Sequence, residues 1–127
     1  MSRPRLSVVV VTLDEEERIR ACLESVAWAD ELIVVDAESR DKTATIAGEL
    51  TDHVFVQPWP GYAAQKNFGI EQAHGEWILS LDADEIVSEA LRAEIETTLA
   101  EGGRAHDGYS GPRRNVFWGR WVRHGGL

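Results

Sequence analysis

The feature that most constrains this fold is a set of short apolar runs that lack polar alternation. The clearest run, residues 6–12, is a near-continuous series of β-branched side chains, and similar runs occupy residues 31–36 and 77–81. A strand that is apolar on both faces is normally buried on both faces, which is typical of parallel sheets in α/β proteins. The sequence therefore predicts a buried, mostly parallel sheet.

Segments with helical periodicity separate these runs. Ile19, Cys22, Leu23 and Val26 recur at helical spacing, and Asp14 with residue 17 is expected to cap the start of that helix. Further helices are expected after Asp41, over residues 62–73 and after Ser88, and further strands at residues 53–56 and 108–116. Residues 58–61, Pro-Trp-Pro-Gly, break the chain. The alternation predicts one α/β domain, residues 1–127, with helices on both faces of the sheet.

Composition and charge exclude several classes of protein. The chain has 127 residues, of which 43% are hydrophobic, so one domain can bury a core. No apolar run approaches the ~20 residues of a membrane-spanning helix, and we expect a cytoplasmic location. A net charge of −9 argues against nucleic acid as a partner. The single cysteine, Cys22, excludes an internal disulfide, and its position predicts a packing role.

The C-terminal segment differs in charge from the rest of the chain. From Arg113 onward it carries four arginines and no carboxylate, together with Phe117, Trp118 and Trp121. Such a segment suits an anionic acceptor or peripheral contact with the inner face of a membrane. The same aromatic residues can instead be core residues whose partners lie past residue 127, and we favour this interpretation.

Carboxylates follow the apolar runs where open α/β sheets bind ligands. Asp36 ends one run, and Asp82 and Asp84 follow another. In an extended Asp-x-Asp segment the side chains point to opposite sides, so we expect one to face a ligand and the other a metal. Carboxylate oxygens suit Mg²⁺ or Mn²⁺, and ligand phosphates would complete the coordination shell. The alternative is an acidic turn that caps the next helix.

The chain lacks the glycine-rich phosphate-binding motifs, Gly-x-Gly-x-x-Gly and Gly-x-x-x-x-Gly-Lys-Ser/Thr. The negative charge of a bound phosphate would therefore have to be neutralised in another way. A metal at Asp84 could neutralise most of the charge of a nucleoside diphosphate, with Lys66 as a second candidate. Lys66 can also be an ordinary exposed helix lysine. Asp36 is placed to accept hydrogen bonds from a ribose or a base N–H, or to serve only as a turn residue.

Five motifs carry a family resemblance. They are VVVVTLDEE at residues 8–16, IVVDAESRDKT at 33–43, QKN at 65–67, GEWILSLDADE at 75–85 and GRWVRHGG at 119–126. In this order they resemble family 2 of the glycosyltransferases, most closely the lipopolysaccharide core β-glucosyltransferase branch. The resemblance implies a GT-A fold with a Rossmann-like nucleotide-sugar-binding half. It also implies an inverting transfer of a hexose, expected to be glucose, from UDP-glucose to a glycan or lipid-linked acceptor.

The resemblance further assigns site residues and a divalent metal, Mn²⁺ or Mg²⁺. The matched positions are Thr12, Glu15 and Asp36 at the nucleoside, Lys66 near the diphosphate, Asp82 at the ribose and Asp84 at the metal. Family members usually have Asn at Asp14 and Gly at Lys42. They also continue past the last motif with the general base, which no residue here matches. We therefore expect a domain that is incomplete at its C-terminus, self-associates through exposed sheet, and transfers little or no sugar alone.

Three other functions fit parts of the sequence. A donor-binding module without catalysis would keep the same pocket residues. A receiver-type phospho-acceptor domain shares the acidic strand ends but needs a lysine after a late strand, and no lysine follows Lys66. A sugar nucleotidyltransferase would place a basic, glycine-rich loop after the first strand, where this chain has residues 14–17, Asp-Glu-Glu-Glu. The glycosyltransferase hypothesis accounts for more of the motifs than any of these.

Overall fold

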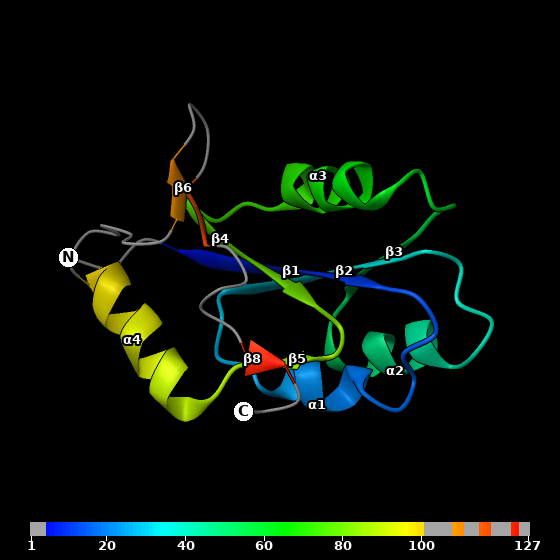
Figure 1. The fold of residues 1–127 in the computed structure, drawn as a ribbon, viewed down its shortest axis with the longest axis horizontal. Helices are drawn as coiled ribbons and strands as arrows, with labels where there is room; N and C mark the ends of the chain where they lie inside the picture. Colours follow the sequence, from blue (N-terminus) through cyan, green and yellow to red (C-terminus); the bar gives the residue numbers. More distant parts are fainter. Residues whose placement is uncertain (1–4, 101–107, 111–114, 118–122, 125–127) are drawn as a thin grey trace.

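The fold is built on a six-stranded sheet (Figure 1). The computed structural model describes residues 5–100, 108–110, 115–117 and 123–124. In sheet order the strands are β3 (His53–Val56), β2 (Glu31–Asp36), β1 (Leu6–Thr12), β4 (Trp77–Asp82), β7 (Asn115–Phe117) and β6 (Gly108–Ser110). All neighbouring pairs are parallel except β6 and β7. A separate antiparallel pair joins β5 (Glu85–Ile86) to β8 (Arg123–His124).

The centre of the sheet is β1, which lies between β2 and β4. All seven residues of β1 are buried, as its apolar sequence predicts. Alternate side chains serve two separate cores: Leu6, Val8 and Val10 belong to one, and Val9 belongs to the other. The prediction of a mostly parallel sheet that is buried on both faces is therefore confirmed.

Helices cover both faces of the sheet, which confirms the second part of the fold prediction. The larger core lies between one face of the sheet and the helices α1 (Ile19–Glu24), α2 (Thr43–Leu50) and α4 (Glu89–Ala100). The helix α3 (Tyr62–Gln72) lies on the opposite face of the sheet (Figure 1). The larger core joins Ile19, Cys22 and Leu23 of α1 to Leu91, Ile95 and Leu99 of α4. In the part of the chain that the structure describes, no helix is long and apolar enough to cross a membrane.

Close contact with the sheet fixes the position of α3. At Gly69 an added Cβ would lie 2.4 Å from Val9 Cγ1 and 3.1 Å from Val35 Cγ2, so only glycine allows this approach. The helix connects the carboxyl end of β3 to the amino end of β4, and it therefore runs antiparallel to both strands. Its first residue, Tyr62, consequently lies at the carboxyl ends of the strands.

Some local predictions are confirmed and others are wrong. Ser88 caps α4, because its Oγ accepts a hydrogen bond from Leu91 N at 3.1 Å. Asp14 does not cap α1: the helix begins five residues later at Ile19, and no side chain caps it. The strand predicted over residues 108–116 is instead two short strands, β6 and β7, which pair antiparallel with each other.

The basic aromatic segment from Arg113 onward has side chains that lie outside the described residues. Its contact with an acceptor or a membrane surface stays a prediction from the sequence.

Candidate functional site

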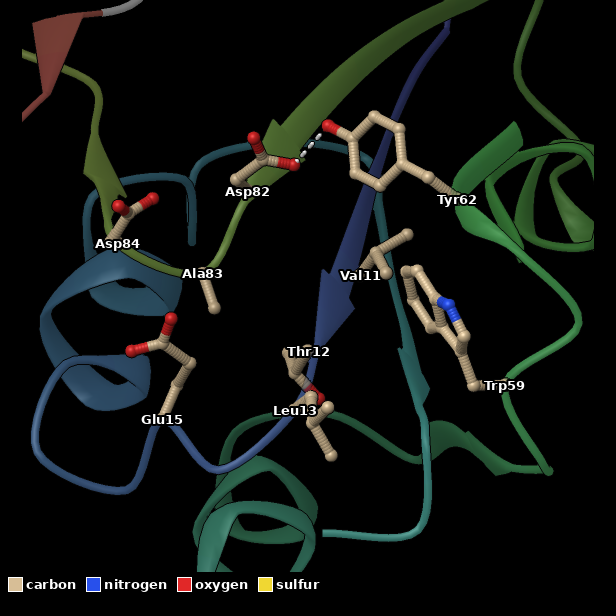
Figure 2. Close-up of a pocket in the computed structure, with 9 residues that line it drawn as sticks. All are labelled: Val11, Thr12, Leu13, Glu15, Trp59, Tyr62, Asp82, Ala83 and Asp84. Atoms are coloured by element: carbon tan, nitrogen blue, oxygen red, sulfur yellow. Dashed lines mark hydrogen bonds between the residues drawn. The ribbon is translucent and has the colours of Figure 1, made fainter. Parts of the chain in front are cut away.

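A pocket of about 270 Å³ opens at the carboxyl ends of β1 and β4 (Figure 2). It is lined by Val11, Thr12, Leu13, Glu15, Trp59, Tyr62, Asp82, Ala83 and Asp84. In Figure 2, Trp59 and Tyr62 lie on one side of the pocket, while Glu15 and Asp84 lie on the other. The pocket therefore has an aromatic wall and an acidic wall.

The acidic wall depends on a turn at the end of β4. The strand ends at Asp82, and Ala83 and Asp84 form a turn, so the Asp-x-Asp segment is not extended. The sequence expectation assumed an extended segment, and the structure has a turn there instead, with both carboxylates beside one pocket. The turn is held by the buried Ala83 side chain and by a 2.7 Å hydrogen bond from Asp82 N to Glu85 Oε1.

The donor set of the acidic wall fits a hard divalent cation. Asp82 and Asp84 offer only carboxylate oxygens, which Mg²⁺ and Mn²⁺ prefer. Among the described residues, no group of three or more His, Cys, Asp or Glu side chains is arranged to hold a metal. A cation bound at these two carboxylates would take only part of its coordination shell from them, and ligand phosphates and water would complete it.

The aromatic wall comes from the start of α3 and the segment before it. Trp59 and Tyr62 are 48% and 47% exposed, and their ring centroids lie 6.3 Å apart. Gly61, with φ of 115°, supplies the backbone turn that leads into α3. From the sequence, residues 58–61 are expected to break the chain and Tyr62 to begin a helix, and neither aromatic residue is predicted to be part of the site. The available signal for Trp59 was its place between two prolines, because such a segment does not lie inside a regular helix or strand.

Tyr62 joins the two walls. Its hydroxyl donates a 2.6 Å hydrogen bond to Asp82 Oδ1 (Figure 2). Partial burial, this hydrogen bond and the surrounding carboxylates raise the pKa of Tyr62, so the phenol stays protonated and remains a donor. The Nζ of Lys66, one turn along α3, lies 4.5 Å from the centroid of the same ring.

Asp36, which contacts Thr12 of the pocket, has a carboxylate that is held by hydrogen bonds from neighbouring residues. It is 1% exposed, and its carboxylate accepts hydrogen bonds from Thr12 Oγ1 at 2.5 Å and from Ser39 N and Oγ at 2.8 and 2.6 Å. A nucleoside N–H would have to share this carboxylate with Thr12 and Ser39.

Two loops at the carboxyl ends of β1 and β2 are bound to each other, and this positions Glu15. The hydrogen bonds run from Asp14 N to Ser39 Oγ, Arg40 N to Asp14 Oδ1, Glu15 N to Thr43 Oγ1 and Glu16 N to Asp41 Oδ2. Asp14 and Glu38 have φ of 52° and 58°, a region that non-glycine residues rarely adopt. Such backbone strain clusters at functional sites. The Glu15 carboxylate lies beside the pocket, 3.0 Å from Arg18 Nη1.

Comparisons with known proteins decide the family. The model of glycosyl transferase family 2 matches residues 7–126. The chain belongs to this family. An uncharacterized glycosyltransferase of Rickettsia bellii is 45% identical over 97 residues, which cover 76% of this chain and 33% of the relative. The lipopolysaccharide core biosynthesis glycosyltransferase LpsC of Rhizobium meliloti is 36% identical over 100 residues, 75% of this chain and 37% of LpsC.

Solved structures confirm the GT-A fold of this family 2 domain. Glucosyl-3-phosphoglycerate synthase of Mycobacterium tuberculosis, in complex with Mn²⁺, UDP and glucosyl-3-phosphoglycerate, matches with a TM-score of 0.66 and 25% identity. The match covers 78% of this chain and 40% of the synthase. The chain spans about a third of the length of the curated relatives it matches.

The fold of this family 2 domain brings most of the expected site residues together. Four of the six, Thr12, Glu15, Asp82 and Asp84, line the pocket. The other two contact residues that line it: Lys66 lies over the Tyr62 ring, and Asp36 accepts a hydrogen bond from Thr12. The structure therefore provides one connected site, in which the ligand roles of the six residues are proposals.

Proposed function

We propose that this chain binds a nucleoside diphosphate sugar, expected to be UDP-glucose, in the pocket of Figure 2. The observation that supports this most is the combination of an aromatic wall and an acidic wall at the carboxyl ends of a parallel sheet. A nucleotide sugar has complementary parts, because its base is flat and its diphosphate binds divalent metals. UDP and Mn²⁺ are bound by the mycobacterial synthase of the same fold.

In this proposal Asp84 holds a divalent metal, Mn²⁺ or Mg²⁺, together with the donor diphosphate. When bound, such a metal supplies Lewis-acid stabilisation of the departing nucleoside diphosphate. Lys66 adds a positive charge on the α3 side of the pocket. These charges are needed because a chain with a net charge of −9 otherwise repels an anionic donor.

The remaining residues orient the nucleoside. Asp82 accepts a hydrogen bond from a ribose hydroxyl, and Thr12 and Asp36 contact the base or ribose from the ends of β1 and β2. Glu15 lies at the opposite edge of the pocket and contacts the nucleoside there. With the donor fixed in this way, an acceptor hydroxyl attacks the anomeric carbon from the face opposite the diphosphate. The bond from this carbon to the diphosphate oxygen breaks, the nucleoside diphosphate leaves, and the configuration is inverted. No residue is assigned as the base that removes the proton of that hydroxyl.

The acceptor class follows from a relative rather than from the pocket. LpsC acts in lipopolysaccharide core biosynthesis by its name. We therefore propose a glycan or lipid-linked acceptor, with the reaction in the cytoplasm at the inner face of the membrane.

Calorimetric titration with UDP and UDP-glucose, with and without Mn²⁺, tests the donor proposal. We expect metal-dependent binding that Asp84→Ala weakens at least tenfold, since a metal-ligand or charge-assisted contact contributes roughly 1.5–3 kcal/mol. Asp52→Ala is the matched control, because Asp52 is exposed and precedes β3 at the opposite end of the sheet. Folded protein that binds neither nucleotide would refute the proposal.

A donor-binding domain without catalysis is the second candidate, because every role proposed for the pocket residues is a donor or metal contact and none removes the proton of an acceptor. This candidate predicts that the chain binds nucleotide but neither transfers sugar nor slowly hydrolyses UDP-glucose. Chromatography of the products after overnight incubation with lipopolysaccharide core acceptors separates the two. Robust transfer by the 127-residue chain would exclude the non-catalytic candidate.

A further inference from the structure

One side chain of the pocket makes contacts that the proposed donor roles do not explain. Tyr62 is the first residue of α3, and half of its surface is exposed at the pocket. Its hydroxyl reaches Asp82 at the end of β4, and its ring lies under the ammonium group of Lys66 in its own helix. Asp82 and Lys66 are on different elements, and Tyr62 contacts both.

The geometry points to Tyr62 as a positioning residue that sets the ribose-binding carboxylate and the diphosphate-binding ammonium relative to each other. This inference rests on the proposed donor site. It assigns separate tasks to the two parts of the side chain: the hydroxyl orients Asp82, and the ring orients Lys66.

The Tyr62 hydroxyl, which we call the hydroxyl arm, acts by fixing one oxygen of the Asp82 carboxylate. Because Asp82 Oδ1 accepts the hydrogen bond from Tyr62 at 2.6 Å, the carboxylate plane is fixed and its remaining lone pairs face in set directions. A carboxylate held in this orientation is what a ribose hydroxyl donor requires.

The aromatic ring of Tyr62, which we call the ring arm, acts by restraining the long side chain of Lys66. A lysine loses about 2 kcal/mol of rotamer entropy when it is held in one conformation. A cation 4.5 Å from the ring centroid is within the range of a cation–π interaction, which restrains the ammonium group before a ligand arrives. The ring itself is held in place by Trp59, whose centroid is 6.3 Å away.

The two arms can be separated with two ligands and two substitutions. UDP carries a ribose and a diphosphate, whereas inorganic pyrophosphate carries only the phosphates. Tyr62→Phe removes the hydroxyl and keeps the ring, and Tyr62→Leu removes both. With Mg²⁺ present, we expect Tyr62→Phe to weaken UDP binding roughly tenfold and to leave pyrophosphate binding unchanged. We expect Tyr62→Leu to weaken the binding of both ligands.

Two further variants connect each arm to its partner. In an Asp82→Ala background, which removes the acceptor of the hydroxyl, Tyr62→Phe is expected to change UDP affinity less than twofold, because the hydroxyl acts through the carboxylate. Lys66→Met is expected to reproduce the pyrophosphate loss of Tyr62→Leu, and Lys42→Met is its control, since Lys42 is exposed and does not line the pocket. The Tm of each variant is measured alongside.

The outcomes are distinct. Wild-type affinity of Tyr62→Phe for UDP would overturn the inference and leave the donor proposal intact. Equal losses for UDP and pyrophosphate in Tyr62→Phe, with a lowered Tm, would show a purely structural tyrosine and would also overturn it. Folded wild-type protein that binds neither ligand would overturn both the inference and the proposed function.

Discussion

At the residue scale, Glu31 shows how the end of the sheet opposite the pocket is held. Its Oε1 accepts hydrogen bonds from Ser7 Oγ and His74 N, both at 2.7 Å, and its Oε2 lies 2.8 Å from His74 Nδ1. Burial raises the pKa of Glu31, but the hydrogen bonds from His74 and Ser7 outweigh it, and the pKa lies below the ordinary value of 4.5. Glu31 therefore ties β1, β2 and the segment before β4 together.

This arrangement predicts a pH-dependent effect of Glu31→Gln. A lowered folded-state pKa contributes stability that is complete above the unfolded pKa and is lost as the pH falls through the folded pKa. We expect Glu31→Gln to lower the free energy of unfolding by about 1–2 kcal/mol at pH 7 and by progressively less below pH 4.5. Urea unfolding at several pH values measures this, with the exposed Glu94→Gln as control. If the difference in free energy of unfolding between the wild type and Glu31→Gln stayed constant down to pH 2, the stabilising role of the ionised Glu31 carboxylate would be contradicted.

Cys22 gives a second prediction at this scale. Its side chain is fully buried in the core between α1 and the sheet, with Sγ 3.6 Å from the carbonyl oxygen of Asp82. Burial, more than the nearby carboxylates, raises the pKa of the thiol, so both access and thiolate formation are suppressed. We expect alkylation of the folded protein to be at least about a hundredfold slower than in urea. Mass spectrometry that shows fast labelling without denaturant would refute the packing role.

At the scale of elements, the position of α3 depends on Gly69. A Cβ at this position would lie within 2.4 Å of Val9 Cγ1, so Gly69→Ala must push the helix away from β1 and β2. We expect a loss of about 1–3 kcal/mol in the free energy of unfolding, partly offset by better helix propensity. Weaker UDP binding should accompany it, because Tyr62 moves with the helix.

The control for this prediction lies in α2. An added Cβ at Gly48 meets nothing within 4 Å, so Gly48→Ala should stabilise the protein by about 0.5–1 kcal/mol through helix propensity alone. Urea denaturation of the two variants measures both effects. If Gly69→Ala were also stabilising, α3 would not be seated on the sheet as described.

At the scale of the whole molecule, the charge of −9 leads us to expect that the proposed donor binding depends on metal. Binding to the folded state alone stabilises it by about 2.7 kcal/mol when the ligand is present at about 100 times its Kd. For a domain of 127 residues this raises the Tm by of the order of 10 °C. We expect this rise with UDP and Mn²⁺ together, and a much smaller one with UDP and a chelator. Equal shifts with and without metal would contradict the role proposed for Asp84.

Exposed sheet edges bear on self-association, which the sequence also predicts. β3 and β6 form the two edges of the described sheet. β3 has only four residues, and its last, Val56, is 56% exposed. A short edge strand of this kind limits edge-to-edge pairing. Self-association stays a prediction that sedimentation can test.

Local sequence patterns were enough to predict the parallel part of the sheet and the family. The runs at residues 6–12, 31–36 and 53–56 match β1, β2 and β3, because strand formation there depends on a local apolar pattern that burial then satisfies. The family motifs are also local, and they placed Asp82 and Asp84 correctly at a strand end. Four of the six expected site residues line one pocket for the same reason, since the carboxyl ends of parallel strands share one edge.

The use that loops and side chains make of that edge depends on contacts between residues that are far apart in the sequence. Asp14 bonds to the loop after β2 rather than capping α1, because its partner Arg40 is distant in sequence and near in space. Ala83 turns the chain and brings both carboxylates to one pocket. Tyr62 reaches Asp82 across 20 positions of sequence because Gly69 seats α3 on the sheet. Such contacts depend on the packing of separate elements, and no local pattern encodes them.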